Sequence, residues 1–420
     1  MYHIPKGVFD ILPDDPEVWR SSHLWQYIEG MVREIAHEYG FFEIRTPMFE
    51  STELFCRSIG KETDIVTKEM YTFEDLGKRS MTLRPEGTAA VLRAFIEKNL
   101  AQQSPIHKFF YIGPMFRYER QQAGRYRQHH QFGVEALGSN SPYQDAEVID
   151  LLHTLLTRLG LKGLGLQINS IGSLEERTAF RSALKNYLKS HLSDLSVDSQ
   201  RRFETNPLRI LDSKCEKDQK ILENAPSISS YVDQEHFNQV LTILNQQKIP
   251  YTINPLLVRG LDYYNNTVFE ITAGELGAQN SLGGGGRYDG LMSELGGPQL
   301  PAFGFGCGIE RVIHTLLGQK INLPKKHSAT LLFIPLDDEA MSICFQWVTT
   351  LRSNHIAAEM DLSGKKLKNS MRYDNNRGVR FVAIVGDNEV KEKRLEIKEM
   401  ETGTVESLSF DDLLKRLQKC

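Results

Sequence analysis

Apolar positions along the chain repeat with helical and strand periods. The first set recurs at intervals of four, three and four: Leu24, Ile28, Met31 and Ile35. This spacing predicts an amphipathic helix over residues 17–38, with Asp15 as its N-cap. Residues 41–47 then predict a short strand, and Pro47 suits the edge of a sheet because proline cannot donate to a central ladder. A helix followed by an edge strand often builds a dimer interface.

Residue patterns typical of β-strands follow at residues 108–112 and 131–137. The strongly polar segment between them, residues 117–130, predicts a charged hairpin loop. Ser141 and Gln144 then have the spacing of a capping box, which predicts the start of another amphipathic helix.

Changes in amino-acid composition and in the strand and helix patterns divide the chain into four segments. Residues 173–251 are rich in lysine and glutamine and lack glycine, which predicts an inserted helical subdomain. Strand patterns stand on both sides of it, at residues 164–170 and 267–272, so we expect the insertion to interrupt one sheet. Beyond a second boundary near residue 322, apolar strands alternate with helices, as in a small α/β domain. The predicted domain ranges are residues 1–172, 173–251, 252–322 and 328–420.

Length and composition narrow the class of protein. The 420 residues exceed one typical domain of ~100–200 residues, and 40% hydrophobic with 25% charged residues is ordinary for a soluble protein. No apolar run approaches the ~20 residues of a membrane span, and the N-terminus lacks a secretory signal, so we expect a cytoplasmic protein. Five widely spaced cysteines without a C-x-x-C pair predict neither a disulfide framework nor a zinc site. The net charge of −4 argues against a nonspecific nucleic-acid coat but leaves a local basic surface open.

Two segments rich in glycine and aromatic residues lie close together, residues 259–264 and residues 283–290. Glycine inside an element costs roughly 0.5–1 kcal/mol relative to alanine, so we expect something to approach the backbone there. Residues 303–311 lack the G-x-G-x-x-G spacing of a dinucleotide site, and the four-glycine run lacks the Lys-Ser/Thr ending of a P-loop. The glycines before Arg311 are interpreted as letting a strand and a helix pack closely while Arg311 projects into a site.

Residues 116–127 crowd four arginines into the predicted hairpin loop. Guanidinium groups match phosphate geometry, so the loop suits a polyphosphate; the alternative is a solvated hairpin tip with internal ion pairs. Residues 84–88 precede a predicted helix, where Glu86 either holds a ligand amine or only caps the helix. The sequence shows no convincing Ser-His-Asp order for nucleophilic catalysis and no H-E-x-x-H motif for zinc binding. The chemistry that remains is phosphoryl or nucleotidyl transfer by positioning and charge stabilisation.

These segments together resemble histidyl-tRNA synthetases, which belong to class II of the aminoacyl-tRNA synthetases. Residues 116–120 are similar to motif 2 of that class, residues 304–311 to motif 3, and residues 17–47 to motif 1. Residues 259–264 and 285–289 are similar to the two segments peculiar to the histidine enzymes. The resemblance runs in order over nearly the whole chain.

The resemblance implies an α+β fold. This fold has a class II antiparallel catalytic sheet of six to seven strands with flanking helices, a helical insertion and a C-terminal α/β anticodon-binding domain, assembled as a homodimer. The implied activity is a ligase that uses ATP to convert L-histidine to histidyl-adenylate and then transfers the histidyl group to tRNA-His. Mg²⁺ would accompany ATP, and no residue is assigned as a metal ligand.

An alternative function is a synthetase-like, histidine-binding regulatory subunit of histidine biosynthesis. Such paralogues generally lack the C-terminal domain and lose the ATP-binding arginines. This chain retains both features, which favours the ligase.

The resemblance also assigns roles to individual residues. Arg117 and Arg259 would be catalytic, on the α-phosphate and the attacking carboxylate. Glu86, Thr88 and Gln131 would hold the amino group of histidine, while Glu135 and Tyr264 would bond its ring nitrogens. The full histidine-binding set is Glu86, Gly87, Thr88, Gln131, Glu135, Tyr263, Tyr264 and Tyr288. The ATP-binding set is Arg117, Glu119, Arg125, His129 and Arg311, with Arg125 on the γ-phosphate and Arg311 stacked on adenine.

Some positions depart from the family pattern. The family usually has phenylalanine at the position of His129, where the ring covers adenine; imidazole can also stack but buries less apolar area. Gln121 and Ala123 differ from common loop residues as well. In the C-terminal domain four basic residues cluster around a predicted helix, either as contacts to the tRNA backbone or as a solvated face. They are Lys365, Lys366, Lys368 and Arg372.

Overall fold

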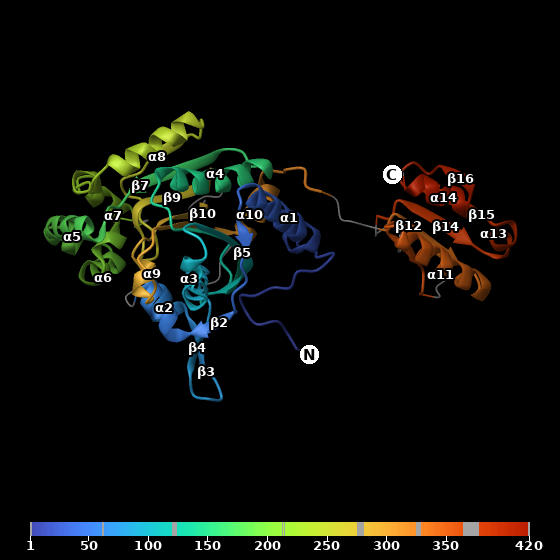
Figure 1. Cartoon of the computed structure of the whole chain (residues 1–420), viewed down its shortest axis with the longest axis horizontal. Helices are drawn as coiled ribbons and strands as arrows, with labels where there is room; N and C mark the ends of the chain where they lie inside the picture. The colour runs from blue at the N-terminus through green and yellow to red at the C-terminus, as the bar shows by residue number, and fades with distance from the viewer. Residues whose placement is uncertain are drawn as a thin grey trace. The chain divides into compact units, whose positions relative to one another are not determined.

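The chain folds into two compact units, Met1–Leu323 and Pro324–Cys420. The computed structural model (Figure 1) describes residues 2–60, 63–119, 124–211, 213, 215–274, 281–324, 329–363 and 378–418. Each unit has its own hydrophobic core. The first unit carries most of the segments singled out in the sequence.

A mixed sheet crosses the first unit, and within the described ranges it has eight strands in the order β1-β5-β6-β11-β10-β9-β7-β8. The six central strands are antiparallel, whereas the short edge strands β1 and β8 pair in parallel. The α+β fold with an antiparallel catalytic sheet is therefore confirmed, with two edge strands added. The bounds are β1 (Phe42–Glu43), β5 (His107–Phe116), β6 (Gln128–Leu137), β7 (Leu164–Ser170), β8 (Tyr251–Ile253), β9 (Asn265–Ala273), β10 (Ser281–Arg287) and β11 (Ala302–Gly308).

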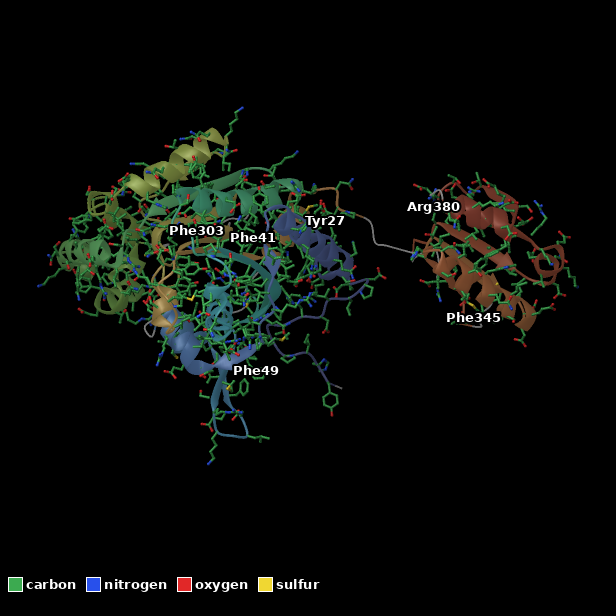
Figure 2. All side chains as sticks on the ribbon, in the orientation of Figure 1. Tyr27, Phe41, Phe49, Phe303, Phe345 and Arg380 are labelled. Carbon is green, nitrogen blue, oxygen red and sulfur yellow. The ribbon has the colours of Figure 1, made fainter. Side chains whose placement is uncertain are left out.

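Four helices cover one face of this sheet (Figure 1), and apolar strand residues such as Phe132, Phe269 and Phe303 pack under them. In Figure 2, Phe41 and Phe303 lie inside this body, whereas Phe49 reaches its surface. The helices are α1 (Ser22–Glu38), α4 (Pro142–Arg158), α8 (Glu235–Gln246) and α10 (Ile309–Gly318). Because side chains alternate along a strand, each central strand has one face that packs under the helices and an opposite face that these helices do not cover.

The first helix begins later than the sequence pattern predicts. It starts at Ser22 after an N-cap at Ser21, not at residue 17. The cause is tertiary, because the amide of Ser22 donates to the carbonyl of Leu12 at 2.8 Å and the buried Trp19 packs edge-on against Phe9. These contacts hold residues 18–20 in a single 3₁₀ turn.

The inserted segment is helical, as predicted, but its last helix packs elsewhere. Its first three helices share a core with the segment that precedes β9, whereas α8 packs against α4 in the main core. The helices of the insertion proper are α5 (Leu174–Lys189), α6 (Val197–Thr205) and α7 (Glu216–Leu222). A complete capping box at Ser173 and Glu176 begins α5.

Smaller elements complete the first unit. A three-stranded sheet has the order β2-β4-β3 and lies next to α2, and Glu50 of β2 forms an ion pair with Arg93 of α3. The bounds are β2 (Phe49–Ser51), β3 (Tyr71–Glu74), β4 (Ser80–Leu83), α2 (Thr52–Ile59), α3 (Thr88–Glu97) and α9 (Leu291–Glu294).

The second unit is the small α/β domain that the strand and helix alternation predicts. Its sheet has the order β13-β12-β14-β15-β16, with parallel pairs around β12 and antiparallel pairs beyond β14. The bounds are β12 (Leu331–Pro335), β13 (Ala358–Met360), β14 (Phe381–Val385), β15 (Arg394–Glu399), β16 (Val405–Ser409), α11 (Asp338–Ser353), α13 (Asp387–Glu392) and α14 (Phe410–Leu417). The predicted basic cluster of Lys365, Lys366, Lys368 and Arg372 lies outside the described residues, as do Gln121 and Ala123.

A fully buried ion pair joins the sheet to helix α4. Arg287, at the end of β10, bonds both carboxylate oxygens of Asp145, and its Nε lies 3.1 Å from Oδ2. Its Nη1 also donates to Asp289 at 3.2 Å, and His236 lies 3.0 Å from the same Asp145. Arg287 is thus part of the framework rather than the pocket, although it belongs to one of the glycine-rich segments.

We expect Arg287→Met to destabilise the first unit by about 3–5 kcal/mol, because it leaves a buried carboxylate at Asp145 without its cation. The measurement is the shift of the urea midpoint, followed by tryptophan fluorescence. Arg33→Met removes an exposed pair with Glu29 and serves as a control, with an expected cost below about 1 kcal/mol. Equal shifts for the two variants would contradict the assignment.

Candidate active site

A pocket of about 230 Å³ opens on the face of the sheet opposite the four covering helices. On β6, Phe132 and Val134 join the core beneath those helices. Gln131 alternates with them and lines the pocket, and Glu135 lies on the same face. On β11 the same two-residue alternation places Phe303 and Phe305 in the core and Gly306 and Gly308 at the pocket.

The floor of this pocket is a strip of strand without side chains. Gly133, Gly306 and Gly284 are direct partners across β6, β11 and β10. A Cβ atom at Gly306 would overlap the Gln131 amide, and one at Gly284 would lie 3.0 Å from Arg259 Nη1. The four-glycine run therefore lies in a central strand, where Gly284 leaves room for Arg259 and the other three glycines pack closely against the neighbouring strands. The interpretation of residues 304–308 as strand-to-helix packing was wrong for the same reason.

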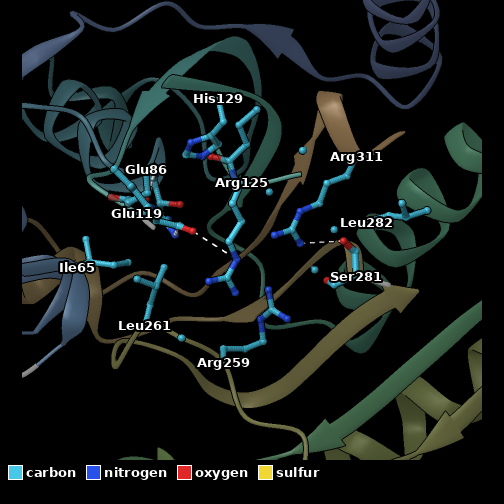
Figure 3. Close-up of a pocket in the computed structure, with 18 of the residues that line it drawn as sticks. Ile65, Glu86, Glu119, Arg125, His129, Arg259, Leu261, Ser281, Leu282 and Arg311 are labelled. Atoms are coloured by element: carbon cyan, nitrogen blue, oxygen red, sulfur yellow. Dashed lines mark hydrogen bonds and ion pairs between the residues drawn. The ribbon is translucent and has the colours of Figure 1, made fainter. Parts of the chain in front are cut away.

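Four guanidinium groups enter the pocket from three different segments. Arg117 Nε donates to the carbonyl of Pro85 at 2.8 Å, and Arg311 Nη1 donates to the carbonyl of Ser281 at 2.9 Å. Arg125 Nε lies 3.4 Å from Glu119, and Arg259 Nη1 lies 3.4 Å from Glu270. Figure 3 shows Arg125, Arg259 and Arg311 directed into the same space.

These arginines are only partly neutralised. Two of them bond to backbone carbonyls, and the buried Nε of Arg259 has no hydrogen-bond partner in the part of the chain that the structure describes. Guanidinium groups bind phosphate and carboxylate oxygens bidentately. The arrangement can therefore hold a polyanion and stabilise negative charge that develops on it.

A second part of the site is a buried cluster of carboxyl and hydroxyl groups. Glu135 accepts hydrogen bonds from Thr88 at 2.7 Å, from Tyr111 at 3.4 Å and from Tyr288. Burial raises the pKa of Glu135 to about 8, in spite of these donors. Of the three, only Thr88 and Tyr111 line the pocket, so Glu135 and Tyr288 lie beneath its wall.

Glu86 is used by the fold as well as by the pocket. Its carboxylate accepts from the amides of Thr88 at 2.6 Å and Ala89 at 2.9 Å at the start of α3, so the capping interpretation is confirmed. Burial raises the pKa of Glu86. Each carboxylate oxygen keeps a second lone pair that can accept from a ligand donor.

The histidines of β6 differ in their surroundings. Burial, with Arg117 nearby, lowers the pKa of His129 to about 3, so its ring is neutral in the pocket. His130 faces Glu310, with its amide 2.7 Å and its Nδ1 3.0 Å from the same carboxylate oxygen. This contact joins β6 to the start of α10, which carries Arg311.

Most residues predicted for the site meet in this one pocket. Gly87, Glu135 and Tyr288 do not line it: Gly87 packs against Tyr111, and the other two lie beneath the wall. The sequence analysis did not predict that Tyr111, Tyr126, Ser281 and Glu310 line the pocket. Tyr111 alternates along its strand with Gly113 and Met115, so the sequence indicated that these three share a face of the strand. Only the strand register shows which strands lie beside that face.

The described residues contain no group of three or more histidine, cysteine, aspartate or glutamate side chains arranged to hold a metal ion. Within the same ranges, no helix has the length and apolar character needed to cross a membrane.

Comparisons with known proteins agree over the whole chain. A family model described as histidyl-tRNA synthetase matches residues 7–312, and one described as an anticodon binding domain matches residues 330–420. A histidine–tRNA ligase of Protochlamydia amoebophila is 56% identical over 421 residues, covering 99% of each chain. One of Chlamydia felis is 48% identical over 421 residues, covering 99% of this chain and 97% of the relative.

A solved structure gives the same result for the fold. The apo histidyl-tRNA synthetase of S. aureus superposes with a TM-score of 0.83 at 37% identity and covers 100% of both chains. The full-length match includes both units, which supports the ligase over the regulatory-subunit alternative. The chain therefore belongs to the histidyl-tRNA synthetase family.

Proposed function

We propose that the protein is a histidine–tRNA ligase that activates L-histidine with ATP and transfers the histidyl group to tRNA-His. The observation that carries this function is the joining of four arginines to a buried carboxyl and tyrosine cluster in one pocket. One part suits a triphosphate, and the other suits an amino acid with two ring nitrogens. The activation step needs both parts side by side.

In the first step a carboxylate oxygen of histidine bonds to the α-phosphorus while the bond to pyrophosphate breaks. Arg117 and Arg259 would bind the oxygens on which charge develops, and Arg125 would bind the γ-phosphate. Arg311 and the neutral His129 would lie against adenine. The side-chain contacts of Glu119 to Arg125 keep that arginine within the pocket before ATP arrives.

Histidine would lie over the glycine floor. Glu86, Thr88 and Gln131 would receive its amino group, and the buried Gln131 Oε1 has no hydrogen-bond partner within the described ranges. Glu135 and Tyr264 would bond the two ring nitrogens, and the Thr88 and Tyr111 side chains that lie between Glu135 and the pocket would move aside when histidine binds. Tyr263 and Tyr288 pack beside Tyr264 at ring distances of 4.6 and 6.4 Å. A site that bonds both nitrogens rejects isosteres that can bond only one.

Mg²⁺ would enter with ATP. Such ions are usually held by one or two carboxylates together with substrate phosphates, and Glu119 and Glu310 are carboxylates on the wall of this pocket. They fit that donor set. When bound, the ion would neutralise part of the phosphate charge, while the arginines position the α-phosphate.

The second unit, which matches an anticodon-binding domain, would bind tRNA-His, and the enzyme would act in the cytoplasm. We also propose a homodimer. Strand β1 is a sheet edge, and apolar side chains near it are exposed, with Phe42 70%, Met48 52% and Phe49 50% accessible. Exposed apolar groups beside an unpaired edge favour association with a second copy.

We expect Arg259→His to slow histidyl-adenylate formation by about 10²- to 10³-fold, because it removes a charged donor to the transition state. The equilibrium affinity for histidine should change little. Single-turnover quench-flow and calorimetry measure the two quantities. Arg79→His, at an exposed arginine, is the control. No histidine-dependent ATP–pyrophosphate exchange in the folded wild-type protein would refute the function.

Histidine binding should depend on the ionisation of Glu135. The free carboxyl has a pKa of about 8, and an imidazole N–H donor favours its ionised form, so binding below pH 8 releases a proton. The Kd for histidine should therefore fall as pH rises from 7 to 8, by up to about tenfold per unit. Glu135→Gln should lose this slope, while titration of the ligand itself is common to both proteins. Parallel Kd curves would contradict the role.

We expect the wild-type protein to sediment at twice the chain mass of 47.9 kDa. Phe42→Asp should shift the equilibrium toward the monomer, because it places a charge on the exposed apolar edge. Sedimentation equilibrium at micromolar concentration measures this. Phe345→Asp, at an exposed position of the second unit (Figure 2), should leave the mass unchanged. A monomeric wild type would show the dimer proposal to be wrong.

A further inference from the structure

The segment between β8 and β9 carries Arg259, Tyr263 and Tyr264 and lies between two cavities. Its pocket side is the candidate active site. On its other side is a second cavity of about 210 Å³, whose far wall is formed by the insertion, including Arg177, Arg181 and Leu208. Arg259 and Leu261 line both cavities. The middle of the segment is therefore a thin partition.

Hydrogen bonds from the insertion hold the backbone of this partition. Arg209 Nη2 donates to the carbonyl of Gly260 at 2.6 Å, and Arg177 Nη1 donates to that of Tyr264 at 2.6 Å. Arg177 also reaches the carbonyl of Asp262 at 3.4 Å. Both arginines thus bond directly beside residues assigned to catalysis or histidine binding.

The side chain of Asp262 adds a further tie to the insertion. Asn206 Nδ2 donates to its Oδ1 at 2.9 Å. The backbone amide of Asp262 instead reaches the carbonyl of Ile59 in α2, outside the insertion, at 3.5 Å. Arg209 is itself oriented by Asp64, whose carboxylate lies 3.8 Å from its Nη1. Donors with a full charge make stronger hydrogen bonds than neutral ones.

The cavity behind the partition makes these bonds decisive. A segment packed against side chains is fixed by repulsion in that direction, but one backed by empty space can move into it. Among the described residues, the guanidinium of Arg259 has one ion-pair partner, Glu270, at 3.4 Å. Its position therefore follows the position of its own backbone, which the insertion holds at Gly260 and Tyr264 while Leu261 packs against helix α2.

We propose that Arg177 and Arg209 are positioning residues that align Arg259 and Tyr264 for the activation step. This inference rests on the proposed function. Because both donors come from the insertion, a displacement of the insertion moves the catalytic arginine and the ring-binding tyrosine together. The insertion is thus mechanically coupled to adenylate formation, and neither arginine touches substrate.

The test compares Arg209→Met and Arg177→Met with Arg181→Met in the full-length protein. Arg181 lines the same cavity, but its Nη2 donates to Thr205 within the insertion, so it is a matched control. We expect Arg209→Met to slow single-turnover adenylate formation about ten- to hundredfold, since small misplacements of reacting groups cost that much. Its Kd for histidine should stay close to that of the wild type. Arg177→Met should impair both, because it bonds at Tyr264.

A second readout does not depend on activity. Amide hydrogen exchange over residues 257–264 should be faster in Arg209→Met and Arg177→Met than in Arg181→Met. Arg209→Lys, which keeps a charged donor, should recover part of the rate. If Arg209→Met does not fold, Arg209→Gln is judged by the same criteria.

The outcomes separate this inference from the function on which it rests. Rates and amide exchange of Arg209 and Arg177 variants equal to those of Arg181→Met would overturn the positioning role, even in an active enzyme. An inactive wild-type protein would overturn the function, and amide exchange would then decide the positioning role by itself.

Discussion

The site depends on one steric constraint, a strip of the sheet that carries no side chains. Gly133, Gly306 and Gly284 are adjacent in register, so no Cβ atom rises from the pocket floor between Tyr111 and Glu270. Room for the side chains of Gln131 and Arg259 exists only because of this strip. The opposite face of the same strands is filled by phenylalanine, which keeps the floor rigid.

Charge is then placed around that floor at a considerable cost in desolvation. The framework contains its own buried ion pair, Arg287 with Asp145, which is satisfied within the protein. The pocket is different, since its arginines exceed their carboxylate partners and Glu135 is buried without a cation, which raises its pKa. Satisfied charges hold the structure together, whereas incompletely satisfied ones are available to substrate.

The sequence pattern was most reliable where local periodicity and burial agree. The apolar face of α1 and strand β7 at residues 164–170 appear where the spacing predicts them. Strands β5 and β6 also form, but each is longer than predicted, and residues 128–130 belong to β6 rather than to the predicted loop. The start of α1 and the packing of α8 against α4 were not predictable, because contacts with Leu12 and Phe9 in one case and with the main core in the other override local signals.

The sequence by itself indicated the family, the α+β class, the boundary near residue 322 and most of the charged residues that line the pocket, because residue type and order carry those signals. It could not determine the strand register, so the glycines at 283–286 had no specific role in the sequence analysis. It also did not distinguish Tyr264, which lines the pocket, from Tyr288, which lies beneath the pocket wall. It also gave no sign that Arg177 and Arg209 hold the segment of Arg259. Those relations join residues far apart in the chain, and only tertiary packing brings them within hydrogen-bond distance.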